Sequence, residues 1–98
     1  MIDASVQTAI PTEFYLGQNY PNPFNAVSRV AFGLPEASRV TIRVFDLSGR
    51  EVSTLVSGEL QAGHHNVVFE AESMVSGAYI VKMETSGLSA VRKIVLMK

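Results

Sequence analysis

Hydrophobic and polar residues alternate with a period of two along much of the chain. The alternation is clearest in 30–34, 40–45, 66–70 and 78–84, where every second residue is apolar. Successive side chains of a β-strand point to opposite faces of a sheet, so this pattern predicts strands with one buried face. A helical period is confined to about one turn, and 71–75 could form such a turn. The pattern therefore predicts an all-β domain.

Three less regular segments complete the set of expected strands, at 13–18, 51–56 and 88–97. Two of them follow sequences typical of turns, at 46–50 and 85–87, and Gly49 is expected to supply the positive φ of a tight turn. Seven short strands with turns at these intervals are typical of a β-sandwich, and short connections favour pairing of sequence neighbours. The expected fold is an Ig-like antiparallel β-sandwich of about seven strands.

The inward faces of these strands define the expected hydrophobic core. Its nine predicted members are Phe32, Leu34, Val40, Ile42, Val44, Val67, Phe69, Tyr79 and Val81. Hydrophobic residues make up 47% of the 98 positions and charged residues only 17%, which supplies enough apolar material for one core and argues against disorder. Residues 1–12 are interpreted as the tail of a linker from an upstream domain, and residues 13–98 as the folded domain.

Charge and composition exclude several classes of protein. Eight basic and nine acidic residues are mixed along the chain, whereas nucleic-acid binding needs a concentrated basic face. No apolar run reaches the 18 residues of a membrane span, so membrane insertion is not expected. Met1 is interpreted as an added start residue of a chain that naturally extends upstream; the alternative is an intact small intracellular protein. The chain has no cysteine, which does not assign it to a compartment.

Residue types that carry chemistry are sparse. Asp46 is best explained as the first residue of an Asx-type turn, because its carboxylate can accept N–H groups from the following residues. His64 and His65 are adjacent on a predicted strand and should point to opposite faces, so they are not expected to share a metal. No serine lies in a nucleophile elbow. We expect no catalysis, no metal and no cofactor.

Five sequence landmarks occur in a fixed order. They are Asn-Tyr-Pro-Asn-Pro-Phe-Asn at 19–25, Phe-x-Leu-Pro-Glu at 32–36, Val-Phe-Asp-x-x-Gly-Arg-Glu-Val at 44–52, Leu-x-Ala-Gly-x-His-x-Val-x-Phe at 60–69, and Ser-Gly-x-Tyr at 76–79 continuing to Lys93. Together they resemble the type A C-terminal sorting domain of the type IX secretion system of Bacteroidetes and related bacteria. The resemblance covers roughly residues 14–98. Ala26 departs from it, because the family often has another proline there.

The resemblance implies a non-catalytic module at the end of a larger exported protein. Such domains fold as Ig-like sandwiches in the periplasm and are recognised by the outer-membrane translocon. In many members a sortase-like surface peptidase then removes the domain and attaches the cargo to a surface lipopolysaccharide. The implied partners are this translocon, the peptidase and an upstream cargo domain, and the implied location is secreted or cell-surface, reached through the periplasm and outer membrane.

The resemblance also implies a recognition segment near the C-terminus. Gly77, Tyr79, Gly87 and Lys93 match the terminal motif, and Arg92 completes the basic pair. Both glycines are expected to occupy turns that need the φ range of glycine. The basic pair has two compatible interpretations, as part of a sandwich strand and as a strand edge offered to a partner by β-augmentation.

Two alternatives remain open for other features. The Pro-rich loop at 21–24 is either a recognition element or a rigid connector, and we favour the connector, with Phe24 closing one end of the sandwich. The rival function is an adhesive or carbohydrate-binding sandwich that tethers an enzyme to a surface. The chain has no tryptophan, and Phe45 is the clearest outward-facing aromatic candidate. A passive spacer between catalytic domains is the third possibility.

Overall fold

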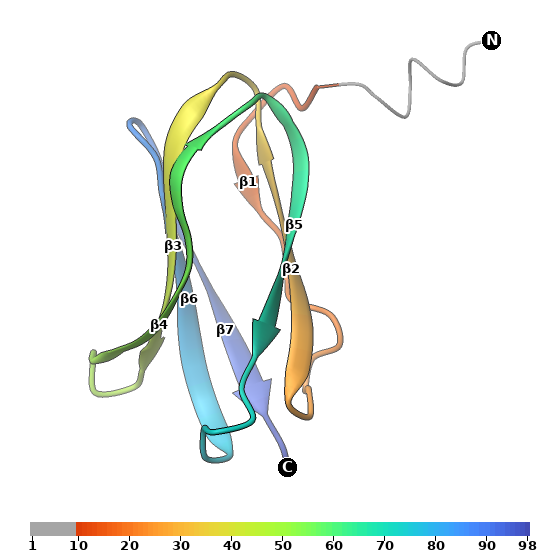
Figure 1. The fold of residues 1–98 in the computed structure, drawn as a ribbon, viewed down its shortest axis with the longest axis vertical. Coiled ribbons are helices and arrows are strands. Elements are labelled where there is room, and N and C mark those ends of the chain that lie inside the picture. Colours follow the sequence, from red (N-terminus) through yellow and green to blue (C-terminus); the bar gives the residue numbers. More distant parts are fainter. Residues whose placement is uncertain (1–9) are drawn as a thin grey trace, which may run out of the picture.

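The computed structural model describes residues 10–98, and in this range it contains seven β-strands and no helix. The strands form two layers that pack face to face (Figure 1). Their bounds are β1 (Tyr15–Leu16), β2 (Val27–Leu34), β3 (Ser38–Asp46), β4 (Glu51–Leu60), β5 (Gly63–Glu70), β6 (Gly77–Glu84) and β7 (Ser89–Leu96). The predicted linker at 1–12 lies mostly outside the described residues.

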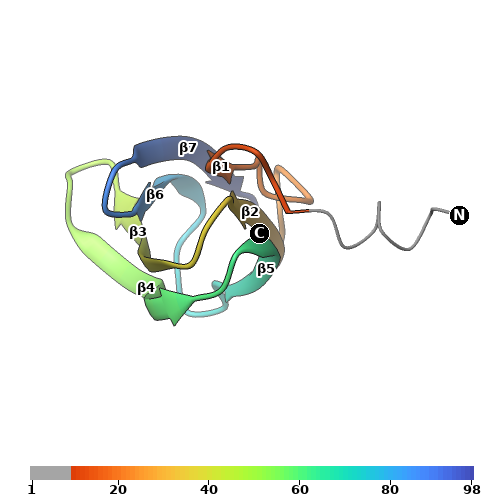
Figure 2. The same ribbon diagram turned by 90° about the horizontal axis from the view of Figure 1, so that it is seen from above.

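All strand pairs are antiparallel, and they make one three-stranded and one four-stranded sheet. The strand orders are β1-β2-β5 and β4-β3-β6-β7. The view along the strands shows the two layers enclosing a common interior (Figure 2). The predicted all-β, antiparallel sandwich of seven strands is confirmed. Gly49 has a φ of 93° in the turn between β3 and β4, as predicted.

Several elements differ from the sequence prediction; β2 and β5, for example, each begin three residues earlier than expected. Strand β1 has only two residues, because the chain enters the Pro-rich loop soon after Gly17. A further backbone bond to β2 runs from the Gly17 N–H to the Ala31 carbonyl at 2.7 Å. Strand β4 extends four residues past the predicted end, and its register with β3 shifts twice, as at β-bulges. The possible helical turn at 71–75 is a simple turn, closed by a bond from the Met74 N–H to the Ala71 carbonyl.

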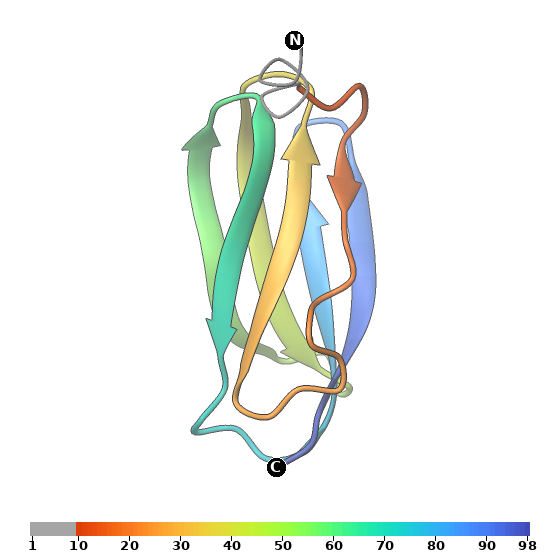
Figure 3. The same ribbon diagram turned by 90° about the vertical axis from the view of Figure 1, so that its right-hand side faces the viewer.

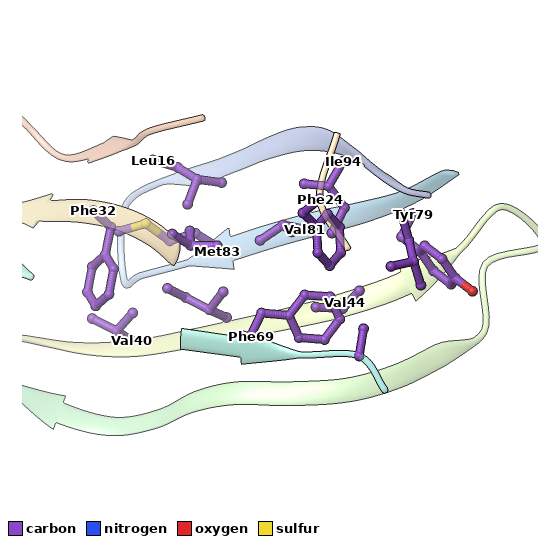
Figure 4. Packing of buried hydrophobic residues seen from close by; sticks show 14 of the residues in the cluster. Leu16, Phe24, Phe32, Val40, Val44, Phe69, Tyr79, Val81, Met83 and Ile94 are labelled. Atoms are coloured by element: carbon purple, nitrogen blue, oxygen red, sulfur yellow. The ribbon is translucent and has the colours of Figure 1, made fainter. Parts of the chain in front are cut away.

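The core lies between the two sheets and is built almost entirely of aliphatic and phenylalanine side chains (Figure 4). Eight of the nine predicted core residues are buried. Val67 is only partly buried, because β5 is an edge strand on the open side of the sandwich. Seven buried hydrophobic residues were not among the predicted nine, and only Phe24 of these had been placed at an end of the sandwich. They are Leu16, Phe24, Val30, Ala71, Met83, Ile94 and Leu96.

Candidate functional site

Strand β7 carries the predicted basic pair and lies at one edge of the four-stranded sheet, hydrogen-bonded to β6 alone among the strands. The opposite edge of β7 is closed toward its C-terminal end by residues 19–25, which we call the covering loop (Figure 3). The Val95 N–H donates to the Asn22 Oδ1 at 3.1 Å, and the Val95 carbonyl accepts from the Phe24 N–H at 2.9 Å. The Met97 N–H donates to the Phe24 carbonyl at 2.8 Å. The loop therefore acts as a short extra strand beside β7.

A buried polar network fixes the shape of the covering loop. The Asn19 Nδ2 donates to the Pro21 carbonyl at 3.0 Å and to the Ser28 Oγ at 2.8 Å, and the Ser28 Oγ donates to the same carbonyl at 3.0 Å. Asn19 and Ser28 are 3% and 1% exposed, so these bonds satisfy groups that water cannot reach. The peptide bonds preceding Pro21 and Pro23 are both cis.

Phe24 anchors the loop in the core. Its side chain is 2% exposed, and its ring centroid lies 5.7 Å from that of Phe69 in a tilted arrangement (Figure 4). Its backbone meanwhile pairs with β7 next to Leu96. The expectation that Phe24 closes one end of the sandwich is confirmed, and the choice of connector over recognition element stays a prediction.

Gly77 and Tyr79 lie at the end of the sandwich where β7 finishes. Tyr79 is 6% exposed and faces the core, opposite Ile94, and its hydroxyl donates to the Val75 carbonyl at 2.6 Å. Gly77 begins β6 opposite Leu96, with a φ of 152°, as predicted for a position that needs glycine. Both residues thus shape the C-terminal end of the fold from within.

Gly87 lies at the opposite end of the β6–β7 hairpin. Its turn is closed by a bond from the Thr85 N–H to the Leu88 carbonyl at 2.8 Å. The prediction that Gly87 needs the φ range of glycine is wrong: its φ is outside the positive region, and an added Cβ would meet no atom within 4 Å. The four-residue turn thus reverses the chain without a left-handed backbone conformation at Gly87.

Arg92 and Lys93 are adjacent in sequence but belong to opposite faces of the sheet. Arg92 pairs with Val81 on the face that carries the core, and Lys93 pairs with Ile80 on the outer face. Both cations are exposed, and neither forms an ion pair with any residue between 10 and 98. The structure therefore does not gather the five predicted residues into one cluster; they follow the β6–β7 hairpin from end to end.

An apolar patch on the outer face adjoins Lys93. Phe45 and Ile80 are paired across β3 and β6, and with Leu47 and Lys82 they line a shallow depression of about 320 Å³. The alternating pattern indicated that Phe45 faces outward but pointed to no role for Ile80. The available signal was an isoleucine on the otherwise polar face of the strand predicted at 78–84.

Asp46 forms the predicted Asx-type turn. Its Oδ1 accepts hydrogen bonds from the Ser48 Oγ at 2.6 Å, the Ser48 N–H at 3.0 Å and the Arg50 N–H at 3.0 Å. The Ser48 hydroxyl, followed by the Arg50 N–H, lowers the pKa of the Asp46 carboxyl below its ordinary value. The ionised Asp46 carboxylate therefore stabilises the folded state at any pH above the ordinary pKa of aspartate. This contribution is lost as the pH falls through the lowered pKa of Asp46 in the folded protein. These contacts explain Asp46 as a structural residue.

The two histidines have separate partners. His64 is hydrogen-bonded to the Tyr15 hydroxyl through Nδ1 at 2.8 Å, whereas the His65 ring stacks on Phe32 and its Nε2 donates to the Gln61 carbonyl. Residues 10–98 contain no group of three or more potential metal-ligating side chains. In the same range no helix has the length and apolar character needed to cross a membrane.

The two glycines of the candidate segment provide a matched pair of substitutions. Gly77→Ala is expected to lower the free energy of unfolding by about 1–3 kcal/mol, because alanine is strained at a φ that is almost restricted to glycine. Gly87→Ala is expected to change it by no more than about 0.5 kcal/mol. Urea unfolding of both variants measures the difference. Equal destabilisation by the two substitutions would contradict this assignment of backbone strain to Gly77.

Comparison with known proteins gives one clear match. The family model described as "secretion system C-terminal sorting domain" matches residues 18–97, which is well over half of the chain. No curated protein matches the sequence. The matched range contains the covering loop, the β6–β7 hairpin and all five candidate residues.

Proposed function

The chain belongs to the family of secretion system C-terminal sorting domains, which act as sorting signals for type IX secretion, and from this membership we propose its route. The domain targets a larger exported protein to the outer-membrane translocon, and the cargo is then attached to the cell surface or released. A sortase-like surface peptidase is the proposed second partner. In this proposal the domain is a targeting module with no catalytic role.

The observation that carries the proposal is that the covering loop and β7, two sequence landmarks far apart in the chain, are hydrogen-bonded to each other. The covering loop and the C-terminal strand are joined by hydrogen bonds at Val95 and Met97, and Phe24 fixes the loop in the core. One end of the domain thus becomes a rigid surface on which the side of β7 is presented. A sorting receptor that reads the folded domain needs such a fixed surface.

The five candidate residues take two kinds of role in this proposal. Gly77 and Tyr79 hold the end of the hairpin in shape, through the backbone conformation of the former and the buried ring of the latter. Gly87 lies in the exposed tip, while Arg92 and Lys93 present charge on the two faces of β7. The exposed three are the proposed contacts with the translocon or peptidase.

The distribution of aromatic side chains gives little support to the rival, carbohydrate-binding function. Such sites use exposed aromatic rings as platforms for sugars. The most exposed aromatic residue among those described is Tyr20, at 78%, which bridges to β2 in the three-stranded sheet. Phe45 is half-buried on the outer face of the other sheet. These two rings lie on different layers and do not form one platform.

Lys93→Ala tests the proposed contact surface. A reporter fused ahead of the domain is expected to reach the surface of a bacterium with type IX secretion, whereas the Lys93→Ala fusion accumulates in the periplasm. The free energy of unfolding should change by no more than about 0.5 kcal/mol, because Lys93 is exposed and has no ion-pair partner among residues 10–98.

Arg29→Ala is the matched control, since it removes an exposed cation from the other sheet. Surface delivery of that fusion should equal that of the unaltered fusion. Delivery of a folded Lys93→Ala fusion at the normal level would show that Lys93 is only a solvated strand residue. Retention of the unaltered fusion inside the cell would contradict the proposed function itself.

A further inference from the structure

Hydrogen bonds occupy only about half of the edge of β7 that faces away from β6, although β1 of the other sheet also lies against β7 (Figure 2). In an antiparallel ladder the backbone N–H and C=O groups of alternate residues point to the same side. Because Val95 directs both groups to the covering loop, Lys93 and Val91 direct theirs to that side too. The Lys93 carbonyl accepts from the Gln18 Nε2 at 2.9 Å. The Lys93 N–H and both backbone groups of Val91 have no hydrogen-bond partner among the described residues.

The free part of this edge is strongly cationic. Arg92 and Lys93 lie on its two faces, exposed and without ion-pair partners between residues 10 and 98. Val91 follows on the outer face with 53% of its surface exposed. Unpaired backbone groups favour addition of a strand, and charges on an edge determine which strand can add.

Strand pairing then dictates the sequence of the incoming segment. A residue opposite Lys93 points to the outer face beside it, and the next residue, opposite Arg92, points to the other face. Two consecutive acidic residues therefore each meet one cation. The residue after them lies opposite Val91, where an apolar side chain covers the exposed valine. An antiparallel donor consequently carries the order acidic, acidic, apolar.

We propose that the free edge of β7 at 89–93 binds, by β-augmentation, an extended strand that carries two consecutive acidic residues followed by an apolar one. The inference rests on the proposed function only in placing this donor strand on a component of the export apparatus. A second copy of the chain is a poor donor, because pairing two β7 edges brings Arg92 and Lys93 of both copies close together. The covering loop limits the docked segment to the part of β7 before Val95.

The binding test uses short blocked peptides with the central sequence Glu-Glu-Val or Lys-Lys-Val and the ¹⁵N-labelled 98-residue chain. The Glu-Glu-Val peptide at millimolar concentration is expected to shift the amide resonances of Val91 and Lys93 saturably. It should bind at least about fivefold more tightly than Lys-Lys-Val, since two exposed ion pairs replace two like-charge contacts. The double variant Arg92→Glu/Lys93→Glu should reverse this preference.

Three outcomes of the titration would overturn the inference. They are equal affinity for the two peptides, saturable shifts confined to other strands, and unchanged Val91 and Lys93 resonances at millimolar Glu-Glu-Val. The last result would indicate that the two cations only protect the edge against self-pairing. Each of these outcomes concerns the isolated chain and is independent of export.

Val91→Pro supplies a second test in the export assay, with Val91→Thr as its control. Proline at position 91 removes only the N–H that points away from β6, so the ladder to β6 is retained, as is usual for proline in edge strands. We expect Val91→Pro to block surface delivery and Val91→Thr to allow it, with both variants folded by circular dichroism. Normal delivery of a folded Val91→Pro fusion would reject strand addition while leaving the proposed function intact.

Discussion

Replacement of Phe24 with alanine is expected to lower the free energy of unfolding by about 3–5 kcal/mol. The side chain is 2% exposed and packs against Phe69, so its removal leaves a cavity at the end of the sandwich. The loss also loosens the covering loop, whose bonds to Val95 and Met97 depend on the position of the Phe24 backbone. A free energy of unfolding of about 5–15 kcal/mol is usual for a domain of this size, so the variant loses a substantial part of it.

Urea unfolding followed by circular dichroism measures this effect. Leu47→Ala is the control, because Leu47 is 68% exposed and its truncation should cost no more than about 0.5 kcal/mol. Hydrogen exchange at the Val95 and Met97 amides should accelerate in Phe24→Ala and remain slow in Leu47→Ala. A stability loss below about 1 kcal/mol in Phe24→Ala would mean that the loop is held mainly by its polar network.

The period of two in the sequence was sufficient to predict the strands and most of the core, because alternation reports directly which face is buried. It failed for Val67, whose alternation is regular but whose strand lies at an open edge. Position within a sheet is decided by pairing partners, and a single strand carries no information about them. Ile94 and Leu96 were missed for a different reason, since the apolar run at 94–97 has no alternation.

The covering loop shows what local pattern cannot reveal. Its proline content predicted a rigid connector, and Phe24 was correctly expected to close one end of the sandwich. The bonds to β7, however, join residues that are 73 positions apart, as between Asn22 and Val95. No periodicity links two such segments, and only the folded topology brings them together.

Among the candidate site residues, the relation between Arg92 and Lys93 was already implicit in the sequence. Adjacent strand residues point to opposite faces, so the two cations could not form one basic patch. The error at Gly87 has another cause: a glycine in a turn sequence does not reveal which turn type forms, and here the turn needs no positive φ at that residue. Gly87 can therefore be tested for recognition without a penalty in stability.

Removal of residues 94–98 is expected to prevent folding of the domain altogether. The deletion eliminates Ile94 and Leu96, which are 0% and 1% exposed. Loss of two such buried side chains lowers the free energy of unfolding by about 4–10 kcal/mol, which is close to the whole stability of a small domain. It also removes the backbone groups to which the covering loop is bonded, so Asn22 and Phe24 lose their partners. Circular dichroism and proton NMR should show an unfolded chain.

Removal of residues 97 and 98 alone is the matched control. Met97 is 59% exposed, and the shorter deletion costs only the bond to the Phe24 carbonyl and the contacts of Lys98 with Ser76 and Glu72. It should leave a folded domain with a free energy of unfolding lower by about 1–3 kcal/mol. The comparison separates folding from recognition, because the shorter chain keeps β7 and both cations. A folded domain after the longer deletion would show that the sandwich closes without its last strand, and that the covering loop has another support.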